Sequence, residues 1–191
     1  MIWLTSDLHF CHNREFLYKP RGFNSIEAHD EALVQNWNNV VNSEDLVYIL
    51  GDLFLNNNEK GIEYLKRLNG NICIILGNHD TPNRQNLIWQ NVKSVMDITY
   101  ADMMKYKSSN GRMYNFYLTH YPSITSNLDN EAPLSQHIIN LYGHTHQKTN
   151  FYNDIPWIYH VGVDSHNCTP VSIEQIIKDC KNKYKEWKDM F

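Results

Sequence analysis

Seven residues whose side chains can bind a metal ion lie in five short clusters along the chain. Two clusters are pairs separated by one residue, Asp7 with His9 and His144 with His146. Residues i and i+2 of an extended segment share a face, so each pair can direct two ligands toward one site. The other three clusters supply single candidate ligands, which are Asp52, Asn78 and His120.

The residue types indicate which metals these clusters would bind. Carboxylate oxygens and neutral imidazole nitrogens suit Mn²⁺, our preferred candidate, and also Fe, Zn or Ni. No cysteine lies in the clusters, which argues against a structural zinc site of the sulfur type. One ion does not need seven ligands, whereas two ions about 3.5–4 Å apart and bridged by a carboxylate would use them. A single Gly-Asp or Asp-x-His is a weak signal, but the ordered set predicts a dinuclear centre.

Three of the clusters directly follow short apolar runs, at residues 2–5, 46–50 and 72–76. Continuous apolar runs of about five residues, bounded by turn residues, predict strands buried on both faces. In open α/β sheets, ligands bind just beyond the carboxyl ends of the strands. We therefore expect these three clusters to meet at one edge of a sheet.

Helices are predicted between these strands. Apolar residues recur at helical spacing over residues 24–41 and 59–68. Asn24 with Glu27 resembles a capping pair, and Pro82 can open a further helix. The alternation of strands and helices predicts parallel strands joined by crossover helices.

The second half of the chain predicts a different arrangement. Shorter links between its apolar runs indicate a second, more antiparallel sheet, and a final helix is expected from Ser172, with Gln175 completing a capping box. The length of 191 residues fits one domain over residues 1–191 without a separate cap. The expected strands of this half cover residues 95–100, 113–119, 139–142 and 157–163.

In this order the clusters resemble the signature of the calcineurin-like metallophosphoesterase superfamily. The chain is most similar to its small bacterial and phage phosphoesterases, through Ser6 to Phe10 followed by His12, Asn36-Trp37-Asn38, His120-Tyr121-Pro122 and Val161 to Asp164. The resemblance implies an α/β fold, a four-layer αββα sandwich of two mixed β-sheets flanked by helices. The superfamily blocks are Asp7-Leu8-His9, Gly51-Asp52, Gly77-Asn78-His79-Asp80, His120 and Gly143-His144-Thr145-His146.

The resemblance also assigns the ligands. One metal ion would take Asp7, His9, Asp52 and His146, and the other would take Asp52, Asn78, His120 and His144, with Asp52 as the bridge. Two carboxylates against two divalent ions leave a net positive site that attracts phosphate.

The expected reaction is hydrolysis of a phosphodiester or phosphomonoester. Water between two metal ions has a lowered pKa, and the resulting hydroxide would attack phosphorus in line. His79 suits the role of general acid, and Asp80 is expected to hydrogen-bond its other ring nitrogen. His12 is a candidate for contact with the substrate phosphate.

Other polar residues near the clusters receive a plainer interpretation. Asp164 is a candidate acceptor for a ligand imidazole, although a structural role is preferred. Residues 123–136 are the expected specificity loop. Surface or structural roles are the preferred interpretation of Arg14, Arg21, His29, His137, His160 and His166.

Composition constrains the partners. The formal net charge is -4, so binding to duplex nucleic acid is not favoured, and a nuclease is an alternative rather than the first hypothesis. A small phosphoester such as a nucleotide is the preferred substrate, with a diester favoured over a monoester. A non-catalytic binding module on the same fold is a third hypothesis, but such a module would be expected to lose ligands.

The compartment is predicted from what the chain lacks. Its first residues show no basic region and no long apolar region of the kind a signal peptide has, and no run is long enough for a membrane span. The four cysteines form no CxxC pair. The cytoplasm is therefore the expected location.

Overall fold

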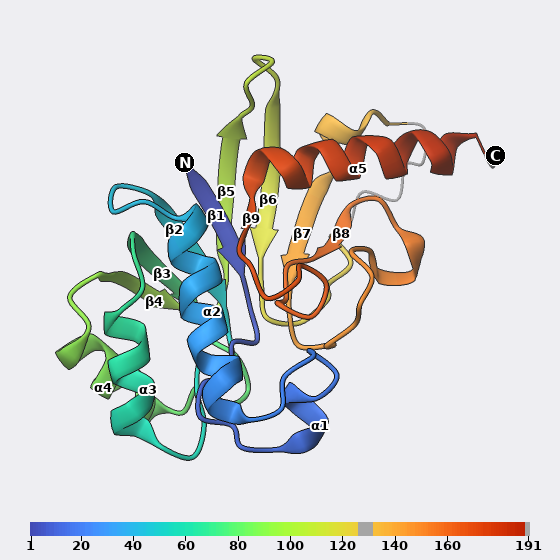
Figure 1. Cartoon of the computed structure of the whole chain (residues 1–191). Helices are drawn as coiled ribbons and strands as arrows, with labels where there is room; N and C mark the ends of the chain where they lie inside the picture. Colours follow the sequence, from blue (N-terminus) through green and yellow to red (C-terminus); the bar gives the residue numbers. More distant parts are fainter. Residues whose placement is uncertain (126–131, 190–191) are drawn as a thin grey trace.

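A computed structural model describes residues 1–125 and 132–189. Within these residues the first sheet has the strand order β4-β3-β2-β1-β9 (Figure 1). Strands β1 to β4 run parallel, and β9 is antiparallel to β1. The strands are β1 (Ile2–Thr5), β2 (Leu46–Leu50), β3 (Asn71–Ile75), β4 (Val95–Thr99) and β9 (Val171–Ser172).

Side chains that point alternately to the two faces of these strands divide the interior into two apolar clusters. Val47 and Ile49 of β2 pack into the cluster on the helical side of the sheet, whereas Leu50 packs into the cluster shared with the second sheet. Because both faces are covered, the apolar runs are continuous, as the sequence predicted.

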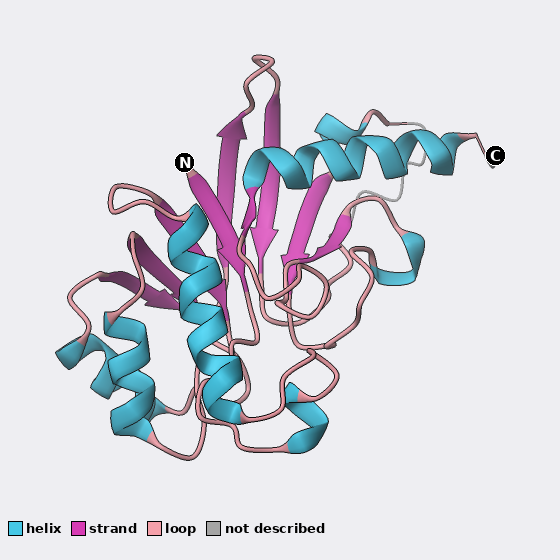
Figure 2. Cartoon of the chain, in the orientation of Figure 1, coloured by secondary structure: helices cyan, strands magenta, loops and turns pink. Residues whose placement is uncertain are grey.

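Three helices cover the outer face of the first sheet (Figure 2). The predicted opening of a helix at Pro82 is confirmed, since Thr81 caps it by accepting from the Arg84 backbone N–H. The predicted Asn24 cap is wrong by one residue, because the Ser25 hydroxyl accepts from the Ala28 N–H. The helices are α2 (Ile26–Val40), α3 (Asn58–Lys66) and α4 (Pro82–Asn91).

The second sheet has the strand order β5-β6-β7-β8. Only β5 and β6 are antiparallel, because residues 108–112 join them as a hairpin. The β6–β7 and β7–β8 pairs are parallel, since each connection is long enough to cross over. The strands are β5 (Asp102–Lys107), β6 (Met113–Leu118), β7 (Ile138–Tyr142) and β8 (Ile158–His160).

One prediction about this half was wrong, and another was only partly right. The run at residues 95–100 was expected in the second sheet, but β4 belongs to the first. The cause is α4, which returns the chain to run β4 parallel to β3. The second sheet was expected to be the more antiparallel one, and it has one antiparallel pair and two parallel pairs. The prediction of two mixed sheets flanked by helices is confirmed.

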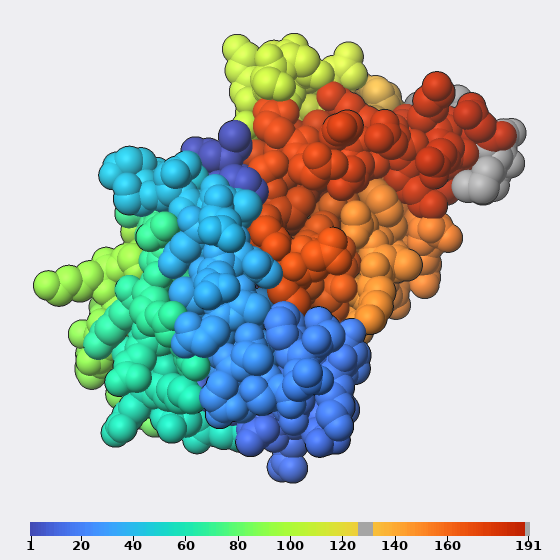
Figure 3. Space-filling view, in the orientation of Figure 1, coloured from blue at the N-terminus to red at the C-terminus, as the bar shows by residue number. Residues whose placement is uncertain are grey.

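The final helix, α5 (Ile173–Lys188), packs Ile176 and Cys180 into the cluster between the sheets. Its cap forms half of the predicted box: Ser172 accepts from the Gln175 N–H, while the Gln175 amide donates to Asp179. In the space-filling view, α5 and α2 leave little of β1 visible between them (Figure 3).

Short elements complete the described chain. The short helices are α1 (Glu15–Tyr18), η1 (Leu134–Gln136) and η2 (Tyr152–Asp154). The predicted specificity loop, residues 123–136, falls partly outside the described residues.

No helix in residues 1–125 and 132–189 is long and apolar enough to cross a membrane.

Candidate metal centre

The predicted ligands come together beyond the carboxyl ends of the parallel strands. They form two groups, and in each group one potential ligand atom of every member lies within 4.8 Å of the others. Asn78 joins the second group through its Oδ1 atom, 2.9 Å from the Nε2 atom of His120. The first group is Asp7, His9 and His146, and the second is Asp52, His120 and His144.

Asp52 lies between the two groups. Its Oδ2 atom is 3.6 Å from the Nε2 atom of His9 and 3.5 Å from the Nε2 atom of His120. Its Oδ1 atom accepts from the backbone N–H of His79 at 3.0 Å, which fixes the carboxylate. One oxygen therefore faces both groups, a position that suits a bridging ligand.

The donor set fits a pair of cations. The Nε2 atoms of His9 and His146 face each other at 3.2 Å. Burial lowers the pKa of His9 well below its ordinary value, and neighbouring His146 and Arg21 lower it further, so its imidazole is neutral and able to bind metal. Burial also raises the pKa of the fully buried Asp7. A buried carboxylate is unfavourable unless a positive charge lies beside it, and a metal ion would supply that charge.

Backbone strain gathers at these same residues. Five ligands are non-glycine residues in the left-handed region of φ, where about 1–3 kcal/mol is stored per residue. The predicted pairs therefore do not present their side chains from an extended segment; the chain turns at each ligand. The five φ values are 57° for Asp7, 50° for His9, 56° for Asp52, 66° for His144 and 49° for His146.

Glycine before the ligands permits the close approach of the loops. A Cβ atom at Gly51 would lie 2.5 Å from the Nδ1 atom of His120 and 2.7 Å from the backbone of Gly77. Gly51 also has a φ of +89°, which favours glycine. A Cβ atom at Gly77 would collide with Asp52. The glycines of Gly51-Asp52 and Gly77-Asn78 are thus required by packing.

Comparison with known proteins decides the family. The family model for calcineurin-like phosphoesterases matches residues 1–190. The chain belongs to the calcineurin-like phosphoesterase family. It is therefore a metal-dependent phosphoesterase of a family that uses two metal ions, and the structure holds two groups of residues that could bind them.

Similar proteins are found in archaea, phages and bacteria. The phosphoesterase is 33% identical to an uncharacterized protein of Methanocaldococcus jannaschii, over 93% of this chain and 89% of that protein. It is 28% identical to the gene 66 protein of Mycobacterium phage L5, over 85% and 86% of the two chains. The solved structure of a protein of unknown function from Aquifex aeolicus shares the fold, with a TM-score of 0.65, 21% identity and coverage of 93% and 98%.

Asp80 has a different role in this phosphoesterase from the predicted one. Instead of the expected hydrogen bond to the His79 ring, its carboxylate accepts from the backbone N–H groups of Asp52, Gly77 and Leu53, at 2.8, 2.8 and 3.2 Å. Asp80 is 5% exposed, and burial raises its pKa although these hydrogen bonds oppose the shift. It holds together the loops that follow β2 and β3.

His79 and His12 lie beside the first ligand group. The His79 ring is half-buried, with its centroid 5.6 Å from that of His9, and its backbone oxygen accepts from the Arg84 guanidinium. The His12 ring centroid is 5.3 Å from that of His9. Both side chains can therefore reach a molecule bound at the centre.

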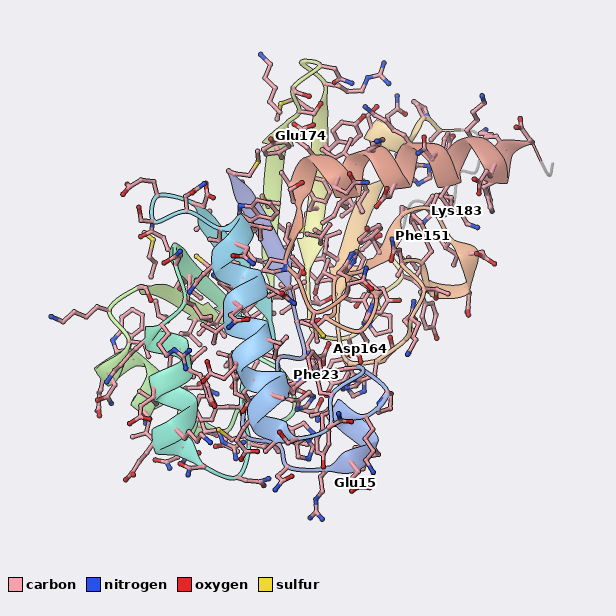
Figure 4. All side chains as sticks on the ribbon, viewed as in Figure 1. Glu15, Phe23, Phe151, Asp164, Glu174 and Lys183 are labelled. Atoms are coloured by element: carbon pink, nitrogen blue, oxygen red, sulfur yellow. The ribbon has the colours of Figure 1, made fainter. Side chains whose placement is uncertain are left out.

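Two supporting residues were underestimated from the sequence. The Arg21 side chain is only 1% exposed and donates to both oxygens of Asp164, at 2.9 and 2.7 Å. Asp164, labelled in Figure 4, lies 2.9 Å from the Nδ1 atom of His146. The Nε2 atom of His146 is left to face His9 and Asp7 at the centre. Burial alone would raise the pKa of Asp164. The hydrogen bonds from His146 and Arg21 outweigh burial and hold this pKa well below its usual range. No local spacing reveals a contact across 143 positions.

Proposed function

We propose that this phosphoesterase hydrolyses phosphodiesters at a centre of two divalent metal ions, with Mn²⁺ preferred and His79 as the general acid. The observation that carries the proposal is the placement of Asp52, whose single Oδ2 atom faces both ligand groups. Asp7, His9 and His146 would hold one ion with Asp52, and Asn78, His120 and His144 would hold the other with it.

Each residue would contribute a defined part of the chemistry. When bound, the two ions would lower the pKa of a water molecule and neutralise charge on the phosphate. His79 stands outside both ligand groups, and its half-buried ring can give a proton to the leaving oxygen. His120 is oriented by the backbone, since its Nδ1 atom lies 2.8 Å from the Leu50 carbonyl oxygen and its Nε2 atom faces the centre.

The charges near the centre support a diester over a monoester. At neutral pH a phosphodiester carries one negative charge, whereas a monoester carries nearly two. Arg21 is already engaged with Asp164, and Arg84 with the His79 carbonyl and Asn58, so neither is free to pair with a second phosphate charge. His12 remains available to contact a phosphate oxygen.

The test is a metal-reconstitution assay. Protein stripped of metal is loaded with Mn²⁺ and assayed on bis-p-nitrophenyl phosphate and p-nitrophenyl phosphate. We expect two ions per chain and faster turnover of the diester. Asp52→Ala should lose metal and at least about 10²–10³-fold in kcat, while His79→Ala should keep both ions and lose about 10²–10⁴-fold.

Asp97→Ala is the control, because Asp97 is an exposed carboxylate on β4. It should behave as the wild type. Binding of one ion or none would reject the dinuclear proposal. Normal turnover by His79→Ala would reject its role as the acid, and faster turnover of the monoester would reject the diester preference.

A further inference from the structure

We propose that the phosphodiester cleaved at this centre joins two nucleosides, and that their bases stack on Phe16 and Tyr121, here called the aromatic pair. The inference rests on the proposed function and adds the substrate class to it. It is carried by two exposed rings, of which Tyr121 contacts two histidines of the second ligand group and Phe16 contacts His12 beside the first group.

Phe16 is presented outward by a short anchored helix. Its neighbours in α1, Leu17 and Tyr18, are buried, whereas Phe16 is 73% exposed. Its ring meets the His12 ring edge-on, with centroids 5.8 Å apart, and His12 in turn lies 5.3 Å from His9. Phe16 is therefore tied to the Asp7, His9 and His146 group.

Tyr121 occupies the corresponding position at the other group. Its ring centroid lies 4.6 Å from that of His144 and 5.1 Å from that of His120. Its backbone oxygen accepts from the Thr119 hydroxyl at 2.8 Å, which anchors the residue, yet half of Tyr121 remains exposed. The side chain thus offers a fixed surface next to the second group.

Together these contacts form a row of rings across the centre. Phe16, His12 and His9 lead to Asp52 from one side, and Tyr121 and His120 lead to it from the other. A phosphate bound at the centre would therefore have an exposed aromatic ring on each side. The two substituents of a phosphodiester would extend toward those rings.

The shape of the pair favours bases over other substituents. A base offers a flat face that stacks on an aromatic side chain whatever its sequence. An acyl chain would need a continuous apolar groove, but in the described residues histidines separate the two rings. Net charge -4 disfavours a duplex. The fitting substrates are a dinucleotide or single-stranded nucleic acid.

The test compares two diesters that differ only in their bases. One is the dinucleotide TpT, and the other is its analogue with abasic tetrahydrofuran sugars at both positions. The variants are Phe16→Ala, Tyr121→Ala and the double variant, all at exposed positions. Trp89→Ala and Tyr100→Ala are matched controls, since these residues are 60% and 75% exposed and, in the described part of the chain, make no ring contact with the site histidines.

We expect the wild type to favour TpT over the abasic analogue by tenfold or more in kcat/KM. Removing either ring should lower kcat/KM for TpT roughly tenfold, chiefly by raising KM. The double variant should lose the preference for bases. Trp89→Ala and Tyr100→Ala should keep it. Equal turnover of the two diesters by the wild type would overturn the aromatic pair and leave the phosphodiesterase proposal standing.

Binding separates the two proposals if no ester is turned over. TpT and the abasic analogue are titrated into Mn²⁺-loaded His79→Ala and followed by calorimetry. Binding that requires the bases, and that Phe16→Ala weakens, would support the pair although the catalytic proposal had failed. No preference for the bases would overturn the pair. An oligothymidylate then distinguishes a strand substrate, which is cut internally, from a free dinucleotide.

Discussion

Two aspartates at opposite ends of the first sheet show how differently the fold treats a buried carboxylate. Asp45 precedes β2 at its amino end, where it accepts from the N-terminal ammonium group at 2.6 Å and from the Trp3 indole at 3.0 Å. Asp7 follows β1 at the carboxyl end, where its neighbours are a hydroxyl, a backbone N–H and histidines. The ammonium group and backbone donors lower the pKa of Asp45 to about 2, whereas burial raises that of Asp7.

The different surroundings of Asp45 and Asp7 indicate that the first carboxylate serves stability and the second serves function. At the amino end, the protein supplies the positive charge itself, and the carboxylate stabilises the fold. At the carboxyl end, left-handed backbone is retained together with a buried carboxylate whose charged neighbours are histidines rather than an ammonium group. Strain of this kind persists where the surrounding structure enforces it and is concentrated at functional sites.

The largest expected effect is on metal binding at the carboxyl end of the sheet, where Asp164 supports His146. Removing its carboxylate in Asp164→Ala frees the His146 ring and leaves the Arg21 charge buried without its partner. Loss of such a support typically weakens metal binding about 10–100-fold. We expect a Mn²⁺ titration, followed by paramagnetic resonance of the free ion, to show one weakened site and one unchanged site.

Asp179→Ala is the control for this prediction, since Asp179 also accepts from a buried side chain, the Tyr159 hydroxyl, but lies on α5 away from the ligands. It should leave both sites unchanged. Equal weakening of the two sites in Asp164→Ala would show that the residue supports the whole fold rather than His146.

A smaller effect, on stability alone, is expected at Asp45. Its folded pKa of about 2 lies below the ordinary 3.8, so ionised Asp45 stabilises the protein above the ordinary pKa. Because the ammonium partner is half-exposed and solvent screens the ion pair, the contribution is about 1 kcal/mol. That contribution is lost as the pH falls from about 4 through about 2. Asp45→Asn should lower the free energy of unfolding by this amount at pH 7, with less difference from the wild type at pH 2, as measured by urea unfolding.

Metal binding should be unaffected by Asp45→Asn, because the residue lies at the end of the sheet away from the centre. Asp97→Asn, at an exposed position of the same sheet, should change neither property. An unchanged unfolding free energy in Asp45→Asn would mean that the N-terminal ion pair contributes nothing to stability.

The contrast between the two ends also explains what could be predicted from the sequence. Buried strands, the helices between them and the ligand set leave direct traces in residue type and spacing. The role of Asp80 does not, because its partners are backbone N–H groups of its own loop and of the loop after β2, and backbone donors carry no residue signature. The placement of β4 was missed because its apolar run looks the same whichever sheet it joins.

The long-range support of the ligands was also beyond prediction. Arg21 reaches Asp164, the Asp7 carbonyl and His29 from a loop before α2. An isolated arginine in a loop is usually exposed, so nothing local distinguishes it. The left-handed φ of His9 and Asp52 is likewise set by tertiary contacts, since either residue type is common in ordinary conformations.

The smallest expected change in stability is at Asp7. It is the sharpest test of the comparison because the substitution should stabilise the metal-free protein, whereas Asp45→Asn should destabilise it. Asn keeps the size of Asp7 and removes the buried charge, so metal-free Asp7→Asn should be more stable than the metal-free wild type by less than about 1 kcal/mol. A ligand that binds only the folded state raises the unfolding temperature, and Asp7→Asn should lose most of that rise with Mn²⁺. Thermal unfolding in chelator and in Mn²⁺ measures both effects. A metal-free variant less stable than the wild type would mean that Asp7, like Asp45, serves the fold before it serves the metal.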